Sequence, residues 1–140
     1  MKTNLHLNFM GTCAEAFAFY ETVFKDKVSF KMTYGEGPAG MPVPEEMKSK
    51  VMHMSMPLGS VVLMGCDTPP DKSAPIGGFQ IAVNLDEEAE VTRIYDALKE
   101  GGSVQMPLMK TFWSPWFGMC TDKFGVGWMV SVPGPEMRKP

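Results

Sequence analysis

The same order of strand and helix patterns occurs twice along the chain, and this repeat constrains the fold more than any other feature. The alternating stretch LHLNF (5–9) is followed by a helical pattern over 12–24, a strand pattern over 27–35 and a hairpin over 50–66. In the second half, FQIAVNL (79–85), a helical pattern over 86–102 and three strand patterns within 103–132 come in the same order. LHLNF aligns with IAVNL, and the hairpin glycine Gly59 aligns with Gly125. The sequence therefore predicts two β-α-β-β-β modules.

The expected division of the chain follows from this repeat. We expect one domain over 1–140, with module 1 at 1–66 and module 2 at 79–133. The Pro- and Gly-rich stretch DTPPDKSAPIGG (67–78) is typical of a linker, and 134–140 is expected to be a tail.

Local signals indicate where elements begin and turn. Thr12 and Glu15 match the S/T-x-x-E capping box of a first helix, and Asp86 is expected to cap the second helix. Asp122 and Gly125 are expected to shape the last hairpin turn.

Composition excludes several classes of function. The net charge of −3 and pI near 5.4, with 13 scattered Lys and Arg, argue against a nucleic-acid partner. No stretch approaches the ~20 apolar residues that span a membrane, and the N-terminus lacks a signal peptide's apolar run. Cys13, Cys66 and Cys120 are odd in number and have no CxxC spacing, which favours reduced thiols in a cytoplasmic protein. The 14 methionines suit soft packing or a varied apolar ligand.

The doubled βαβββ unit resembles the vicinal oxygen chelate superfamily, which includes glyoxalase I, bleomycin-resistance proteins and extradiol dioxygenases. LNFMGTCAEAFAFYETVF (7–24) and TFWSPWFGMCTDKFGVGWMV (111–130) are similar to its PhnB-like branch, which often carries the label 3-demethylubiquinone-9 3-methyltransferase. The resemblance implies an α+β fold in which tandem modules form curved mixed sheets around a cup. It also implies a homodimer, in which modules pair within one chain or between two chains.

The polar faces of two predicted strands are the expected lining of this cup. Asn4, His6 and Asn8 share one face of the first strand, because successive side chains of a strand point to opposite faces. Gln80 and Asn84 occupy the corresponding face in the second module. The apolar faces are expected to pack on the helices, which leaves the polar faces free for a ligand.

By resemblance, the four metal positions of the superfamily fall at Asn4, Met64, Gln80 and Met129. Divalent zinc, iron or manganese prefers imidazole and carboxylate ligands, whereas these positions carry two amides and two thioethers. We therefore expect no catalytic metal and no other cofactor.

The sequence leaves more than one role possible for each of the two histidines. His6 faces the expected cup, where an imidazole could transfer a proton, bind an anion or only form a hydrogen bond in the lining. His53 could reach the same cavity or a dimer surface, or have a structural role.

All three tryptophans lie between residues 111 and 130. Trp128 alternates with Met129 and is expected in the core. Trp113 and Trp116 flank Ser114-Pro115, and proline interrupts a strand ladder. We expect these two rings at a strand end or cavity rim, where they form an apolar wall or a dimer contact together with Phe112 and Phe117.

The leading functional hypothesis is the binding of a small apolar or aromatic molecule in the cup, with or without turnover. One alternative is a metal-dependent lyase, isomerase or dioxygenase of the same superfamily. The methyltransferase activity is disfavoured, because GEGPAG (35–40) runs into Pro42 and Pro44 rather than into a helix that could hold S-adenosylmethionine. A further alternative is that the aromatic segment (111–130) is mainly an assembly surface. For the loop over 35–47, the sequence leaves two interpretations open, a lid or an unordered stretch.

Overall fold

The computed structural model describes residues 1–135, which form two compact units, 1–76 and 77–135. The last five residues of the predicted tail lie outside the described part. None of the helices within residues 1–135 is long and apolar enough to cross a membrane.

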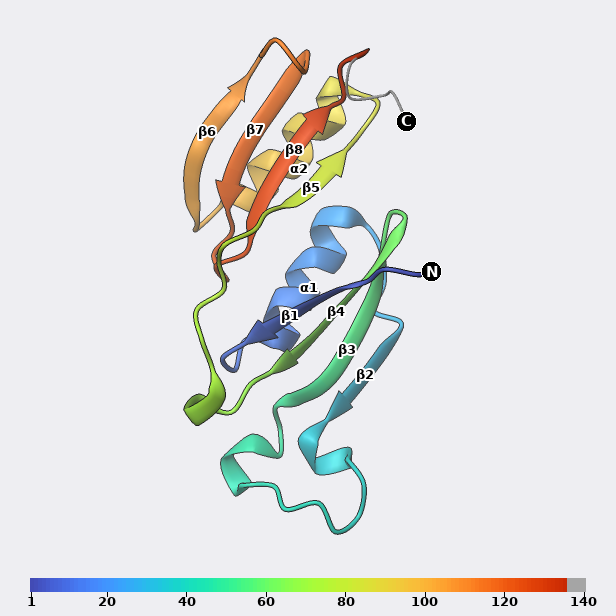
Figure 1. The fold of residues 1–140 in the computed structure, drawn as a ribbon, viewed down its shortest axis with the longest axis vertical. Coiled ribbons are helices and arrows are strands. Elements are labelled where there is room, and N and C mark those ends of the chain that lie inside the picture. The colour runs from blue at the N-terminus through green and yellow to red at the C-terminus, as the bar shows by residue number, and fades with distance from the viewer. Residues whose placement is uncertain (136–140) are drawn as a thin grey trace. The chain divides into compact units, whose positions relative to one another are not determined.

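The first unit contains one four-stranded sheet and one helix (Figure 1). The sheet order is β1-β4-β3-β2, with β1 parallel to β4 and the other neighbours antiparallel. Its elements are β1 (Leu5–Phe9), α1 (Cys13–Phe24), β2 (Phe30–Thr33), β3 (Val51–Leu58) and β4 (Val61–Asp67). The irregular loop between β2 and β3 contains two 3-10 turns, Tyr34–Glu36 and Glu45–Met47, and a third turn, Pro70–Lys72, follows β4.

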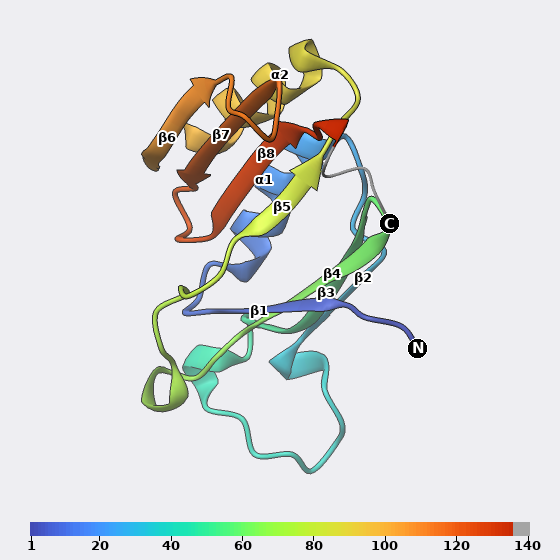
Figure 2. The same ribbon diagram turned by 45° about the horizontal axis from the view of Figure 1, so that its top comes forward.

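The second unit repeats this topology. Its sheet order is β5-β8-β7-β6, again with only the first pair parallel. Its elements are β5 (Ile81–Asn84), α2 (Glu88–Lys99), β6 (Ser103–Met109), β7 (Trp116–Thr121) and β8 (Gly127–Val132). In each unit the helix covers one face of its own sheet (Figures 1 and 2). The predicted tandem βαβββ modules and the α+β class are confirmed.

Each core lies between the helix and the sheet. In the first unit, Leu7 and Phe9 of β1 are buried together with Phe17 of α1. A Cβ atom at Gly65 would lie 2.8 Å from the Phe17 ring, so only glycine permits this approach of helix and strand. In the second unit Trp128 is fully buried, which confirms its predicted place in the core.

The start of α1 is capped by a residue that is distant in sequence. Thr12 is the N-cap residue but its side chain makes no capping hydrogen bond, so the predicted capping box is wrong. Instead the buried carboxylate of Asp67, at the end of β4, accepts hydrogen bonds from the backbone N–H groups of Gly11 (2.9 Å) and Cys13 (3.0 Å) through Oδ1. Oδ2 accepts from the N–H of Val51 at 2.9 Å. One side chain therefore joins α1, β3 and β4.

The start of α2 also differs from the prediction. Glu87, not Asp86, is the N-cap residue, and no side chain caps this end. Glu87 has extended backbone angles (φ −116°, ψ 130°), so the chain enters the helix one residue later than expected.

The turn between β7 and β8 is built around Asp122, as predicted. Its Oδ1 accepts from the N–H groups of Phe124 (2.8 Å) and Val126 (3.1 Å), and its Oδ2 accepts from the Trp128 indole N–H (2.9 Å). Gly125 has φ of 93°, a left-handed conformation that favours glycine.

Candidate functional site

The face of the first sheet that points away from α1 carries polar and sulfur-containing side chains. His6 and Asn8 are exposed, whereas their neighbours Leu7 and Phe9 are buried, so β1 has the two unlike faces that its sequence predicts. His6 is in register with Met64 of β4, and Asn8 with Cys66. We call this surface the open face of the first unit.

Three rings form a row across this open face. The imidazoles of His6 and His53 are stacked, with centroids 6.1 Å apart and planes inclined by 21°. The ring of Phe30 lies 5.8 Å from His53. Phe30 was not among the sequence-predicted site residues; its alternation with Met32 in β2 is the pattern that could have indicated a shared face.

The environment of His6 favours its neutral form. Partial burial, followed by repulsion from His53, lowers the pKa of His6 below its ordinary value. A neutral imidazole offers one donor and one acceptor nitrogen together with a flat surface for stacking.

Cys66 extends the polar edge of this face. Its thiol donates a hydrogen bond to Asn8 Oδ1 at 3.3 Å. Burial and the nearby charge of Asp67 raise the pKa of Cys66, so the group stays a thiol and is a poor nucleophile.

The second unit presents a corresponding open face. Asn84 is exposed, and its Oδ1 accepts a hydrogen bond from the hydroxyl of Ser131 at 3.2 Å. Gln80 lies before β5 and beside Gly127, since a Cβ atom on that glycine would be 3.1 Å from Gln80 Cγ. Met129 is in register with Ala82.

The residues at the four positions implied by the family lack the donor chemistry of a divalent-metal site. The register places His6, not Asn4, beside Met64, and it places Ala82, not Gln80, beside Met129. Among the eight strands the acidic residue is Asp67, whose carboxylate already accepts three backbone N–H groups. Within residues 1–135, no group of three or more His, Cys, Asp or Glu could hold a metal ion. Two amides and two thioethers do not fit zinc, iron or manganese.

The two candidate tryptophans have different surroundings. The Trp116 indole N–H donates to Thr92 Oγ1 of α2 at 2.9 Å, which places this ring on the helix side of the sheet. The hairpin register could have indicated this position. Trp116 is paired with Val132, which lies on the same face of β8 as buried Trp128. Trp113 instead packs edge-on against Phe117, with centroids 5.3 Å apart.

Comparisons with known proteins agree with this architecture. Protein PA1353 from Pseudomonas aeruginosa has a solved structure that is 40% identical in sequence, with a TM-score of 0.85 and coverage of 96% of this chain and 98% of that chain. Protein YjdN from Escherichia coli K12 is 29% identical over 143 residues, covering 94% of this chain and 95% of YjdN. A Bacillus cereus structure described as a putative 3-demethylubiquinone-9 3-methyltransferase, PhnB protein, has 24% identity and a TM-score of 0.77, and covers 94% of this chain and 99% of that chain. At that identity it supports the fold alone.

A family model gives the assignment directly. The model of the Glyoxalase/Bleomycin resistance protein/Dioxygenase superfamily matches residues 6–130, which is most of the chain. The match spans both modules, so the superfamily that the sequence resembles is confirmed. The chain belongs to the glyoxalase/bleomycin resistance/dioxygenase superfamily.

Proposed function

We propose that this protein binds a small apolar or aromatic molecule on the open faces of its sheets, without a catalytic metal. The observation that carries the proposal is the row of His6, His53 and Phe30 rings on a sheet face. Flat rings attract a planar apolar ligand through offset or edge-on stacking, worth about 0.5–1.5 kcal/mol per pair beyond area burial.

The remaining groups of the first open face complement this row. Met64 lies in register with His6 and supplies a polarizable thioether. Asn8 and the neutral His6 can hydrogen-bond to a polar substituent of the ligand. We assign His6 as the proton-transfer group in case the bound molecule is turned over, because its lowered pKa leaves it free to accept a proton at neutral pH.

In the second unit, the proposal includes Gln80, Asn84 and Met129, which occupy the repeat-related positions. Trp113 is kept as a contact at the edge of that sheet. Trp116 is left out, because its indole is bound to Thr92 of α2.

Two other activities find less support in the residues. A metal-dependent lyase, isomerase or dioxygenase needs donors that the family positions lack. For methyl transfer from S-adenosylmethionine, the expected site is a Gly-rich turn from a parallel strand into a helix. Here β2 is antiparallel to β3, and the Gly-rich stretch after it begins in a 3-10 turn and continues to Pro42.

The neutral fluorescent probe N-phenyl-1-naphthylamine tests the proposal. Its affinity should fall about fivefold in His6→Ala and in Phe30→Ala, which is the loss expected for one stacking partner. The control is Val104→Ala, which removes an exposed apolar group of the second unit. Equal affinities of all four proteins would refute the role of the ring row. Native mass spectrometry of freshly purified protein would identify a retained molecule directly.

The homodimer implied by the family is part of the proposal. Val62 of β4 lies outside the ring row and is 37% exposed, so this apolar side chain is available for a partner chain. Light scattering at several protein concentrations should give the mass of two chains, and a monomer at all of them would contradict pairing.

A further inference from the structure

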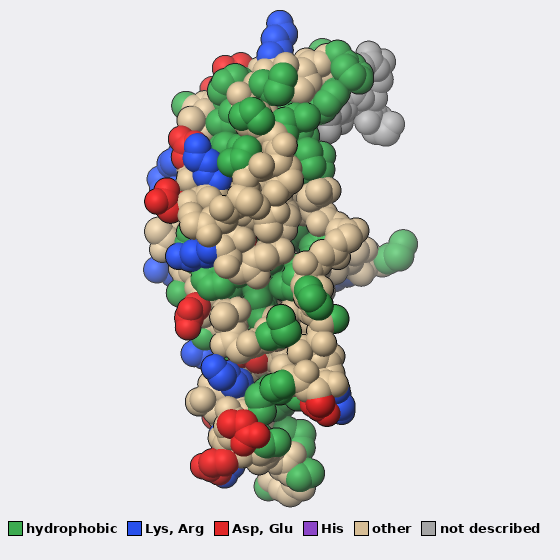
Figure 3. All heavy atoms as spheres, turned by 90° about the vertical axis from the view of Figure 1, so that its left-hand side faces the viewer, with side chains coloured by type: hydrophobic (Ala, Val, Ile, Leu, Met, Phe, Trp, Pro, Cys, Tyr) green, Lys and Arg blue, Asp and Glu red, His purple; other side chains and the backbone are tan. Residues whose placement is uncertain are grey.

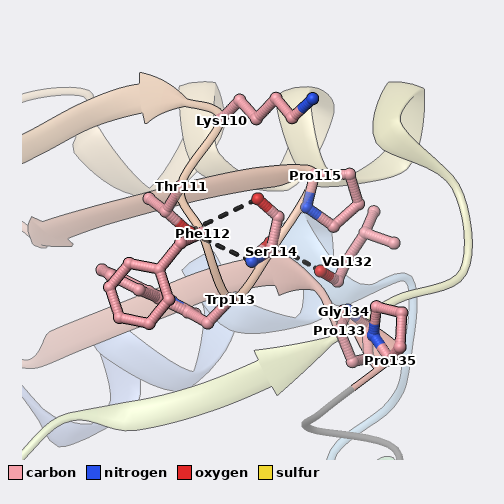
Figure 4. Close-up of a pocket in the computed structure, with 10 residues that line it drawn as sticks. All are labelled: Lys110, Thr111, Phe112, Trp113, Ser114, Pro115, Val132, Pro133, Gly134 and Pro135. Atoms are coloured by element: carbon pink, nitrogen blue, oxygen red, sulfur yellow. Dashed lines mark hydrogen bonds between the residues drawn. The ribbon is translucent and has the colours of Figure 1, made fainter.

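A pocket lies in the second unit between the segment after β6 (residues 110–115) and the end of β8 with the residues that follow it (132–135) (Figure 4). Its volume is about 480 Å³. Small-molecule sites commonly occupy roughly 300–1,000 Å³. All lining residues belong to this unit, and none of them lies on the open face of the first unit.

Most of the pocket wall is apolar. The rings of Phe112 and Trp113 meet edge to face, with centroids 4.7 Å apart and planes at 84°. The rings of Pro115 and Pro135 lie on the other side of Ser114 in Figure 4. Phe112 is 97% exposed, and apolar side chains also gather over the second unit in Figure 3. An aromatic body placed against these rings would remove their surface from water.

The polar groups at the base of the pocket are already used. The Ser114 hydroxyl lies 2.6 Å from the carbonyl of Val132 and 2.9 Å from that of Trp116. The carbonyl of Ser114 accepts from the N–H of Thr111 at 2.9 Å, and the carbonyl of Trp113 accepts from Gly134 at 3.1 Å. Because these carbonyl groups already accept hydrogen bonds within the protein, a ligand does not need to donate one to them.

Several donors around the pocket, by contrast, are unused. The Lys110 ammonium forms no ion pair with the residues that the structure describes. The indole N–H of Trp113 and the backbone N–H of Phe112 likewise donate to no residue within 1–135. Lys110 is the charged member of the lining. A surplus of donors and one positive charge favour an acceptor-rich, anionic ligand group.

We propose that this pocket binds a small aromatic carboxylate. The ring contacts Phe112, Trp113 and the prolines, and the carboxylate pairs with Lys110 and accepts from the free N–H groups. The pocket shares no residue with the ring row on the first unit, and it shares Trp113 alone with the second-unit residues of the proposed function.

The probe pair 2-naphthoate and 2-naphthamide tests the inference, since the two differ in charge but hardly in shape. We expect 2-naphthoate to shift the Trp113 indole N–H signal in a ¹H–¹⁵N spectrum, assigned with Trp113→Phe. It should bind about fivefold more tightly than the amide, which is the gain expected from one exposed ion pair. Lys110→Gln should abolish this preference, whereas the control Lys123→Gln should keep it.

Three results with the two probes would overturn the inference, and a fourth concerns where the signals move. They are equal affinity for the two probes, no binding of 2-naphthoate at millimolar concentration, and an unchanged charge preference in Lys110→Gln. Signals that move only at His6 and His53 would also overturn it, while leaving the proposed function of the first open face intact. The same spectra report whether each variant is folded.

Discussion

Replacing Asp67 by alanine should destabilise the first unit strongly. The carboxylate is 1% exposed and accepts from three backbone N–H groups, on Gly11, Cys13 and Val51. An unsatisfied buried donor costs about 1–3 kcal/mol, and water entering the vacated space moves the cost toward the lower limit. Three donors then give a loss of about 3 kcal/mol in the free energy of unfolding. For a chain of this size the melting temperature should fall by roughly 10 °C.

Two companion variants separate the hydrogen bonds from the charge. Asp67→Asn keeps one oxygen acceptor but directs an NH₂ group toward a backbone donor, so we expect a loss of about 1–2 kcal/mol. Asp71→Ala removes an exposed carboxylate nearby and should change stability by less than about 0.5 kcal/mol.

Thermal melts followed by circular dichroism measure the loss, and hydrogen exchange locates it. The amides of Gly11, Cys13 and Val51 should exchange faster in Asp67→Ala than in the parent protein. A melting temperature within 2 °C of the parent, or unchanged exchange at these three amides, would refute the argument that Asp67 joins the helix start to the sheet.

Three further predictions concern packing, titration and thiol reactivity. Gly118→Ala places a Cβ atom 2.7 Å from the ring of Tyr95 and should cost about 1–3 kcal/mol in chemical denaturation, whereas a stability equal to the parent would contradict this contact. An NMR titration should show His6 with a midpoint below its ordinary pKa of 6.5, and the midpoint should be higher in His53→Gln. Because the pKa of His6 is lowered in the folded state, neutral His6 contributes stability above pH 6.5. This stability is lost as the pH falls through the lowered pKa. Iodoacetamide at pH 8 should modify half-buried Cys66 before the two buried cysteines, and simultaneous labelling of all three in mass spectra would show that burial does not protect them.

Much of the fold could be predicted because its signals are local. The alternation in LHLNF determines which side chains of β1 face the core, and the matching order of elements in the two halves predicts the repeated topology. The capping predictions for Thr12 and Asp86 failed because a cap depends on which group lies at the helix start in space. At α1 this group is Asp67, which belongs to another strand.

The sequence could predict which face of a strand each candidate site residue occupies, but not which residues of different strands come into contact. Alternation indicated that His6 and Asn8 point away from the helix, but it could not indicate that His6 stacks on His53 from β3. Trp116 illustrates the opposite case, because the proline before it suggested a rim position while the hairpin register brings its indole to Thr92.

The sequence by itself determined the two βαβββ modules, the unlike faces of their strands and the amide and thioether chemistry at the family's metal positions. These properties depend on residue type and on spacing within one element, and both are present in the sequence before the chain folds. Only the tertiary structure decided that Asp67 caps α1, that His6 and His53 stack, and that residues 110–115 and 132–135 line one pocket. Each of these depends on strand register and on the approach of distant segments, and those distances are defined only when the elements pack.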